Sequence, residues 1–293
     1  MVRALADGLE RHVADASVET IVVSSEDPRA FSAGGDMKRV RELVLGADFE
    51  PVDAFFREEY ALNLAIARCP KPYVALIDGI AMGGGLGISV HGSHRVVSER
   101  ARLAMPETRI GMIPDVGASH FLPRLPHRAG WWIALTAEPL DGAEAVAVGL
   151  ATHAVPSEAF PRLVEALERG ERDVDAAIGD LPALDPDPDF AGLLERRAKW
   201  FAGDRIDRIE GDLAGAAGLD EDAARLREAL NAGSPFSIGA TLALFDGGRE
   251  RTLDRALVRE LAAVREAVRH PDFAEGVRAV LVDKDGAPVW TGR

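Results

Sequence analysis

The feature that most constrains this fold is the run KPYVALIDGIAMGGGLG at Lys71–Gly87, in which an apolar segment leads into three consecutive glycines. Residues Pro72–Ile77 have the unbroken apolar character of a buried strand. Glycines 83–85 let main chain approach a ligand without obstruction by Cβ atoms, and the residues from Leu86 onward suit a helix. A strand-to-helix turn leaves free N–H groups at a helix N-terminus, where negative charge is favoured. This turn therefore predicts a place for an oxyanion.

A second turn of the same kind lies upstream. The short apolar strand Ile21–Ser24 is followed by AFSAGGDM at Ala30–Met37, ahead of a helical stretch. Two such turns can supply two donors to one carbonyl oxygen. Each turn alone also fits a tight structural turn. A nucleotide site is not indicated, because GxxxxGK[ST] is absent and MGGGLG lacks the GxGxxG spacing.

Two carboxylates follow the glycine run, in AMPETRIGMIPDVG. Glu107 and Asp115 stand on either side of a Gly-Met-Ile-Pro turn, which can bring both side chains toward one pocket. Paired carboxylates are suited to general acid and base chemistry, so together with the backbone donors they suggest an acyl-transfer site. Asp115 also fits a helix N-cap ahead of Val116 and Gly117.

The pattern resembles the crotonase (enoyl-CoA hydratase/isomerase) superfamily, and within it the branch of 3-hydroxyisobutyryl-CoA hydrolases. The matching segments span nearly the whole chain in the family's order: AFSAGGDM, FFREEYALN, KPYVALIDGIAMGGGLGISVHG, AMPETRIGMIPDVGASHFLPRL, GLATHAV and HPDFAEGVRAVLVDKDGAPVW. The first and third mark the superfamily, whereas FFREEY, IPDVG and DFAEGVRAVLVDKD are specific to the hydrolase branch. The resemblance implies an α/β fold, a spiral of stacked ββα units with a helical C-terminal region.

The resemblance also implies roles for individual residues. The backbone N–H groups of Ala33 and Gly84 form an oxyanion hole around the thioester carbonyl. Glu107, with Asp115, either activates water or attacks that carbonyl to give a mixed anhydride that water opens. Glu59 in FFREEY matches an acid that contacts the 3-hydroxyl of the acyl group. The remaining predicted substrate-binding positions are Gly34, Gly35, Asp36 and Gly83.

Simpler interpretations of two of these residues stay open. Glu59 stands beside Glu58, and such a pair is common on a solvated helix face. Gly84 also fits a position where only close packing is needed. Cys69 is the single cysteine, so neither a disulfide nor a CxxC metal site is expected.

Three functions compete. The resemblance favours hydrolysis of a short 3-hydroxyacyl-CoA, such as 3-hydroxyisobutyryl-CoA in valine catabolism. A hydratase or isomerase of the same superfamily is weakened by Gly87, because hydratases carry a second glutamate at this position. A non-catalytic CoA-binding protein is the third possibility, and the two acids Glu107 and Asp115 count against it.

The chain has 293 residues and a formal net charge of −14, which argues against a nucleic-acid partner. CoA is anionic, so local cations have to line its path. Lys38, Arg39 and Arg41 are candidates, with a solvated helix face as the alternative. Beyond the CoA of the substrate we expect no cofactor and no metal. Without an apolar run long enough to span a bilayer, we expect a cytoplasmic protein that makes no membrane contact, and a homo-oligomer is possible.

The pattern of elements divides the chain into residues 1–157, an α/β core, and residues 158–293, a mainly helical region. Five helices are expected in the second part, at residues 159–172, 190–202, 221–232, 238–247 and 253–268. A proline- and acid-rich break separates the first two, at residues 181–189. Members of the superfamily usually begin with a pair of strands, whereas this chain begins inside the helix that follows, Val2–Ala14. We therefore expect either that the true start lies upstream of Met1, or that the first strands are missing and the sheet edge they would cover is exposed.

Overall fold

The computed structural model describes residues 1–292, which form two compact units interleaved along the chain. Unit 1 comprises Met1–Gly34, Glu58–Leu103 and Leu140–Pro188. Unit 2 comprises Gly35–Arg57, Ala104–Pro139 and the chain from Asp189 onward. The predicted division after residue 157 is sequential instead, and as a domain boundary it stays a prediction. Residue 157 does mark a change in secondary structure, because the last strand of the described residues ends at Ala154 and only helices follow.

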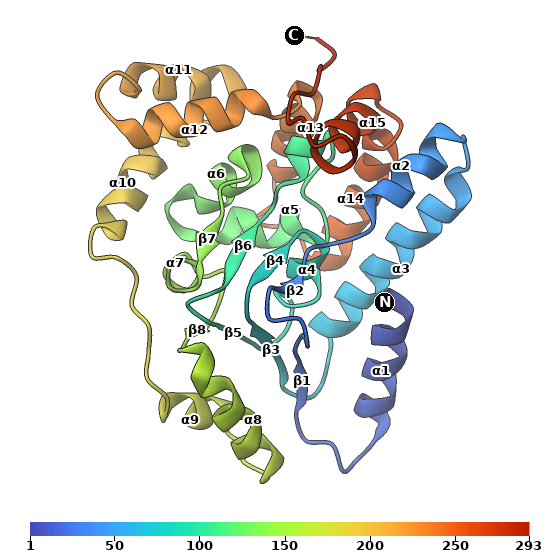
Figure 1. Ribbon diagram of the computed structural model, residues 1–293, viewed down its shortest axis with the longest axis vertical. Coiled ribbons are helices and arrows are strands. Elements are labelled where there is room, and N and C mark those ends of the chain that lie inside the picture. The colour runs from blue at the N-terminus through green and yellow to red at the C-terminus, as the bar shows by residue number, and fades with distance from the viewer. Residues whose placement is uncertain (293) are drawn as a thin grey trace. The chain divides into compact units, whose positions relative to one another are not determined.

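Unit 1 contains two four-stranded sheets (Figure 1). The first sheet is parallel and has the order β1 (Ile21–Val23), β3 (Tyr73–Ile77), β5 (His94–Val97) and β8 (His153–Ala154). The second has the order β2 (Ala30–Ser32), β4 (Ile80–Met82), β6 (Arg102–Ala104) and β7 (Leu140–Asp141). In the second sheet β2 and β4 are parallel, and β6 and β7 are antiparallel. The predicted α/β fold with parallel strands is thus confirmed.

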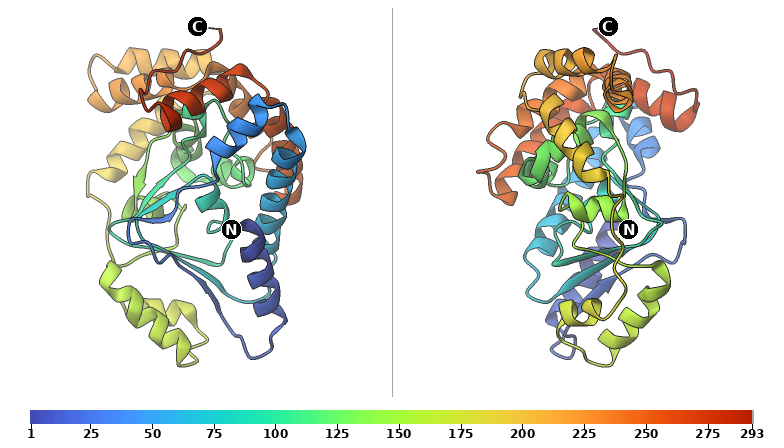
Figure 2. Two further views of the ribbon diagram at one scale, coloured as in Figure 1. Left: turned by 45° about the vertical axis from the view of Figure 1, so that its right-hand side comes forward. Right: turned by 90° about the vertical axis from the view of Figure 1, so that its left-hand side faces the viewer.

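The central strand β3 is buried at all five residues, as expected for a strand covered on both faces of a parallel sheet. Helices α8 (Phe160–Glu168) and α9 (Val174–Gly179) cover one face and lie side by side (Figure 2). Leu163 of α8 packs there in one cluster with Val74 and Val96 of the sheet. Helix α1 (Val2–Ala14) has the predicted bounds, and α7 (Gly142–Ala147) begins with a capping box at Asp141.

The helix after the glycine run is much shorter than predicted. Helix α4 (Gly84–Gly87) has only four residues, and the chain then turns through Gly92 to enter β5 at His94. The prediction of a helix from Leu86 onward is therefore wrong. Glycine is a weak helix former, and a Cβ atom at Gly92 would contact the backbone carbonyl of Tyr73 at 2.9 Å, so this turn packs tightly on β3.

Unit 2 is built from helices and short helical turns. The long helix α3 (Phe49–Ala67) begins in this unit and ends in unit 1. The others of at least seven residues are α2 (Met37–Leu45), α6 (Ala129–Thr136), α10 (Phe190–Trp200), α11 (Ile206–Ala216), α12 (Glu221–Ala232), α13 (Pro235–Phe245), α14 (Leu253–Ala267) and α15 (Pro271–Val277). Helices α11 and α12 lie side by side in both figures. Residues 181–188 contain no helix, which confirms the predicted break.

A buried ionic cluster stabilises the packing of these helices. Arg197 of α10 is 4% exposed and donates two hydrogen bonds to Asp222, with Nε–Oδ2 at 2.9 Å and Nη2–Oδ1 at 2.8 Å. Its guanidinium also lies over the Trp132 ring of α6, 4.5 Å from the ring centroid. Asp222 receives a further bond from Arg225, which also binds Glu138. One paired cation thus joins three helices.

Candidate functional site

The two predicted glycine turns lie against each other in unit 1. Gly34 has φ 91°, and Gly83 has φ 53° with ψ −117°, conformations that side chains disfavour. A Cβ atom at Gly34 would lie 3.2 Å from the carbonyl oxygen of Met82 and 3.5 Å from the nitrogen of Gly84. The first N–H of α4 belongs to Gly84 and has no partner inside that helix. The turn after β2 and the turn after β4 therefore form one backbone surface. The oxyanion hole at Ala33 and Gly84 stays a prediction.

Glu59 places a carboxyl group beside this surface. It lies on α3 and is 6% exposed, and a Cβ atom on Gly84 would be 2.6 Å from its Oε1. Burial raises the pKa of Glu59 from its ordinary value near 4.5 to about 7. The neighbouring Glu58 is half-exposed and accepts two hydrogen bonds from Arg3, at 2.7 and 2.8 Å. The solvated-face interpretation is therefore correct for Glu58 and wrong for Glu59.

Asn63, one helical turn after Glu59, is a further polar residue of this region that was not predicted from the sequence. Asn63 is fully buried, and its Nδ2 donates to the carbonyl oxygen of Gly87 at 3.0 Å. This bond ties α3 to the end of α4. The spacing of four residues from Glu59 places both polar groups on one face of α3, a signal that was available in the sequence.

The two predicted catalytic acids lie in unit 2 and are withdrawn from solvent. Glu107 is 7% exposed and begins a short 3₁₀ turn, Glu107–Ile110, and Asp115 is 6% exposed. Between them Gly111 adopts φ 69°, and the N–H of Met112 donates to the carbonyl oxygen of Glu107 at 3.0 Å. Two acidic side chains withdrawn from solvent within nine residues are thus a feature of this segment.

The capping interpretation of Asp115 is wrong. The next helix is α5 (Ala118–Phe121), whose N-cap is Gly117, and no side chain caps it. The backbone carbonyl of Asp115 instead accepts a hydrogen bond from the N–H of Ala118 at 2.8 Å.

Two other predicted substrate-binding residues have local structural roles. Asp36 caps α2, accepting a hydrogen bond from the N–H of Arg39 at 3.0 Å. A Cβ atom on Gly35 would lie 2.8 Å from side-chain atoms of both Met37 and Phe55, so a larger residue there would make these two side chains shift. Substrate contacts of Gly35 and Asp36 stay a prediction.

The three candidate cations for CoA differ in their surroundings. Arg39 forms an exposed pair with Glu42 at 2.8 Å, and the Arg41 Nε donates to the carbonyl oxygen of Ala274 at 2.7 Å. Lys38 is exposed and forms no ion pair with the described residues. Of the three, Lys38 is therefore the cation most available to a phosphate.

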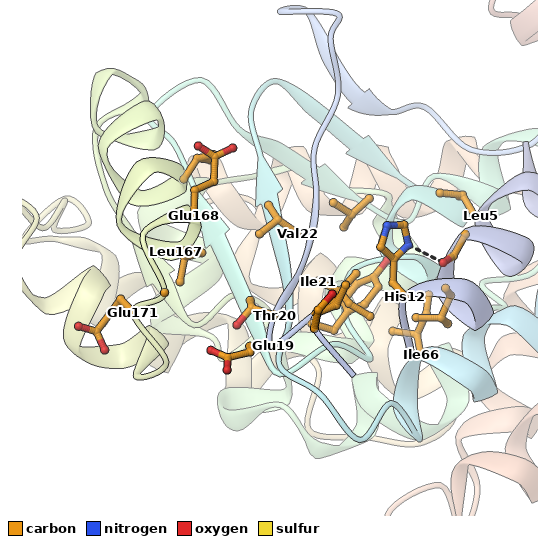
Figure 3. A pocket seen from close by; sticks show the side chains of 18 of the residues that line it. Leu5, His12, Glu19, Thr20, Ile21, Val22, Ile66, Leu167, Glu168 and Glu171 are labelled. Atoms are coloured by element: carbon orange, nitrogen blue, oxygen red, sulfur yellow. Dashed lines mark hydrogen bonds between the residues drawn. The ribbon is translucent and has the colours of Figure 1, made fainter. Parts of the chain in front are cut away.

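A cavity of about 560 Å³ opens elsewhere in unit 1, along the outer edge of β1 (Figure 3). Residues of α1, β1, α3 and α8 line it, with Glu19, Glu168 and Glu171 among them, and within the described chain none of the predicted site residues does. Among the described residues, strand β1 pairs only with β3 and lies at the edge of this sheet.

Among residues 1–292, no group of three or more histidine, cysteine, aspartate or glutamate side chains is arranged to hold a metal ion. No helix in the same range is both long and apolar enough to cross a membrane.

Comparison with known proteins decides the family. The model of the enoyl-CoA hydratase/isomerase family matches residues 1–293. The chain belongs to this family. Two mammalian family members, the mitochondrial 3-hydroxyisobutyryl-CoA hydrolases of Mus musculus and Homo sapiens, are 38% identical to the chain over 303 and 305 residues. Each match covers 99% of this chain and 77% of the relative.

Solved structures of the enoyl-CoA hydratase/isomerase family share the fold. An enoyl-CoA hydratase from Rhodobacter sphaeroides superposes with a TM-score of 0.88 at 36% identity, over 99% of this chain and 84% of that one. A carnitinyl-CoA dehydratase from Mycobacterium thermoresistibile superposes with a TM-score of 0.90 at 32% identity, over 99% of this chain and 83% of that one. These matches confirm the predicted family and fold, and the prediction that the chain is an enzyme similar to the hydrolase branch.

Proposed function

We propose that this chain hydrolyses a short 3-hydroxyacyl-CoA, with 3-hydroxyisobutyryl-CoA as the first candidate, to the free hydroxy acid and CoA. The observation that carries the proposal is the buried carboxyl of Glu59, held against the Gly84 turn. A buried acid at this position has a use if it binds a polar group of the acyl chain, since burying it otherwise only costs free energy. Relatives named as 3-hydroxyisobutyryl-CoA hydrolases support the same substrate, and with it a role in valine catabolism.

The proposed chemistry uses the predicted residues as follows. The N–H groups of Ala33 and Gly84 stabilise the negative charge that develops on the thioester oxygen, where each such donor contributes about 10²–10³ in rate. Glu107 and Asp115 act on the carbonyl carbon by one of two routes. Either they take a proton from the attacking water, or one carboxylate attacks and water then opens the resulting anhydride. In both routes the C–S bond breaks, CoA leaves as a thiolate and is protonated.

Hydration of an enoyl-CoA is the second candidate function, because the two solved structures described above are an enoyl-CoA hydratase and a carnitinyl-CoA dehydratase. Gly87 argues against it. This residue ends α4, is buried, and contributes only its carbonyl oxygen, which Asn63 binds. A second glutamate, which the superfamily resemblance leads us to expect in a hydratase, is thus missing at this position. A CoA-binding protein without catalysis is the third candidate, and it gives no reason to bury Glu107 and Asp115.

Three further properties belong to the same proposal. We infer that the reaction needs no cofactor other than the CoA of the substrate, and that Lys38 contacts a CoA phosphate. A homo-oligomer and a cytoplasmic location stay predictions, and the relatives described above are named as mitochondrial proteins.

The test is release of free thiol from 3-hydroxyisobutyryl-CoA by the purified chain, with crotonyl-CoA as the control substrate. The Glu107→Gln variant should lose at least about 100-fold in kcat, because a neutral amide is neither a base nor a nucleophile. Glu266→Gln is the matched control, since Glu266 is exposed on α14.

Thiol release that is lost only in Glu107→Gln supports hydrolysis. Addition of water to crotonyl-CoA without thiol release would establish the hydratase alternative. Binding of CoA with neither reaction would point to the non-catalytic alternative.

A further inference from the structure

A buried glutamate outside the predicted site holds the turn that carries Asp115. Glu260 lies on α14, its side chain is fully buried, and it accepts three hydrogen bonds. Its Oε2 accepts the N–H of Gly117 at 2.7 Å, and its Oε1 accepts both the N–H and the hydroxyl of Ser119, at 2.8 and 2.6 Å. Every one of these donors lies within four residues of Asp115.

The turn needs such support because its backbone is strained. Val116 has φ 52° and Gly117 has φ 89°, so two successive residues adopt left-handed conformations. For a β-branched residue such as Val116 this conformation is a clear outlier. A strained turn persists when its surroundings fix it, and strain of this kind is concentrated at functional sites. The hydrogen bonds to Glu260 fix the N–H groups of Gly117 and Ser119, which lie on either side of Ala118.

A purely structural explanation accounts less well for the choice of glutamate. Burial raises the pKa of Glu260, and the hydrogen bonds from Ser119 and Gly117, together with the charge of Arg251, only partly offset this effect. Within the described residues Glu260 forms no ion pair with an arginine or lysine, in contrast to Asp222. Helix α5 has only four residues, so the stability of this helix alone does not explain why an acid is buried beside it.

We propose that Glu260 is a positioning residue, which sets the direction of the Asp115 carboxylate through the backbone of the turn Val116–Ser119. This inference rests on the proposed function, in which Asp115 acts on the thioester. Misplacing a reacting group by about 1 Å costs on the order of 100-fold in rate, whereas substrate binding at other contacts is unaffected. Loss of the Glu260 bonds should therefore lower kcat and leave KM nearly unchanged.

The experiment compares Glu260→Gln with Glu266→Gln, the same change at an exposed position of the same helix. In Glu260→Gln the amide nitrogen faces a donor, so at least one bond to the turn is lost. We expect kcat to fall at least about 10-fold with KM within about 3-fold, and the Gly117 and Ser119 amides to lose hydrogen-exchange protection. Glu266→Gln should match the wild type in all three measurements.

Several results would overturn the inference. If the turn in Glu260→Gln loses its hydrogen-exchange protection while kcat is unchanged, the role of Glu260 is structural. The same conclusion follows if kcat and KM change in parallel. If Glu260→Gln does not fold, Ser119→Ala decides, because it removes one of the three donors and should lower kcat about 2- to 10-fold. Unchanged kcat in folded Ser119→Ala also refutes the role. A wild-type chain that releases no thiol contradicts the proposed function itself, and this result is obtained before any variant is compared.

Discussion

Replacing Glu59 by glutamine should make the protein more stable and less active, and the gain in stability should depend on pH. The pKa of Glu59 is about 7 in the folded chain, against an ordinary value near 4.5. Because the folded pKa is raised, this carboxyl group contributes its full stability below pH 4.5, where it is protonated in both states. The contribution is lost as the pH rises toward 7, because the unfolded chain releases the proton first. At about 1.4 kcal/mol per pH unit, the whole loss is roughly 3 kcal/mol.

Glutamine keeps the shape of the side chain and never ionises. The free energy of unfolding of Glu59→Gln, relative to the wild type, should therefore increase by roughly 2–3 kcal/mol between pH 5 and pH 8. Denaturant unfolding at the two pH values measures it. Glu58→Gln is the control, because Glu58 is half-exposed and paired with Arg3. The free energy of unfolding of this variant, relative to the wild type, should change little between the two pH values.

The activity of the same variant tests the proposed role. If the Glu59 carboxyl binds the 3-hydroxyl of the acyl group, glutamine should lower kcat/KM for 3-hydroxyisobutyryl-CoA about 10- to 100-fold, the range of a hydrogen bond to a charged group. For isobutyryl-CoA, which lacks the hydroxyl, the change should be small. An equal loss for both substrates, or a stability difference independent of pH, would refute this reasoning.

Two further variants address the two units separately. Gly84→Ala places a methyl group 2.6 Å from Glu59 Oε1, well inside van der Waals contact, so the carboxyl group has to move. We expect the rate of thiol release to fall about 100-fold while the circular dichroism spectrum stays that of the wild type. A kcat within a factor of two would show that this surface does not serve catalysis. Arg197→Ala leaves the half-buried Asp222 with only one cation, so denaturant unfolding should show a loss of about 3–5 kcal/mol with unchanged KM. A loss below about 1 kcal/mol would mean that the cluster is not essential to the packing.

The strands of the first sheet and most of the longer helices could be predicted because their signals are local, whereas the short strands of the second sheet, β2, β4, β6 and β7, were not predicted. The unbroken apolar run before the glycines marks β3, and the spacing of apolar residues marks helices such as α12, whose predicted bounds are those observed. Helix α6 was missed because it is buried on all sides and shows no polar face. Helix α11 was missed because its glycines weaken the helical signal, although Ile209 and Leu213 are buried one turn apart.

Burial of single charged residues was harder to predict than the elements that carry them. Glu58 and Glu59 are adjacent and identical, and only the direction of α3 decides that one is half-exposed and the other buried. The hydrogen bond between Glu260 and Gly117 joins residues 143 positions apart, so no local pattern contains it. Asn63 lies between these cases, because its spacing from Glu59 was visible but its partner, the carbonyl of Gly87, was not.

Asp222, Glu59 and Glu260 differ in how their charge is balanced. Burial alone raises the pKa of Asp222, yet hydrogen bonds from Arg197 and Arg225 lower it overall, as expected for an acid that holds helices together. Glu59 and Glu260 form no ion pair with an arginine or lysine among the described residues, and burial raises the pKa of both; for Glu260 the charge of Arg251 offsets this only in part. An acid kept without an arginine partner weakens the fold at neutral pH. A chain gains from keeping it only when the carboxyl group binds something else, which for Glu59 is the proposed substrate hydroxyl and for Glu260 is the strained turn beside Asp115.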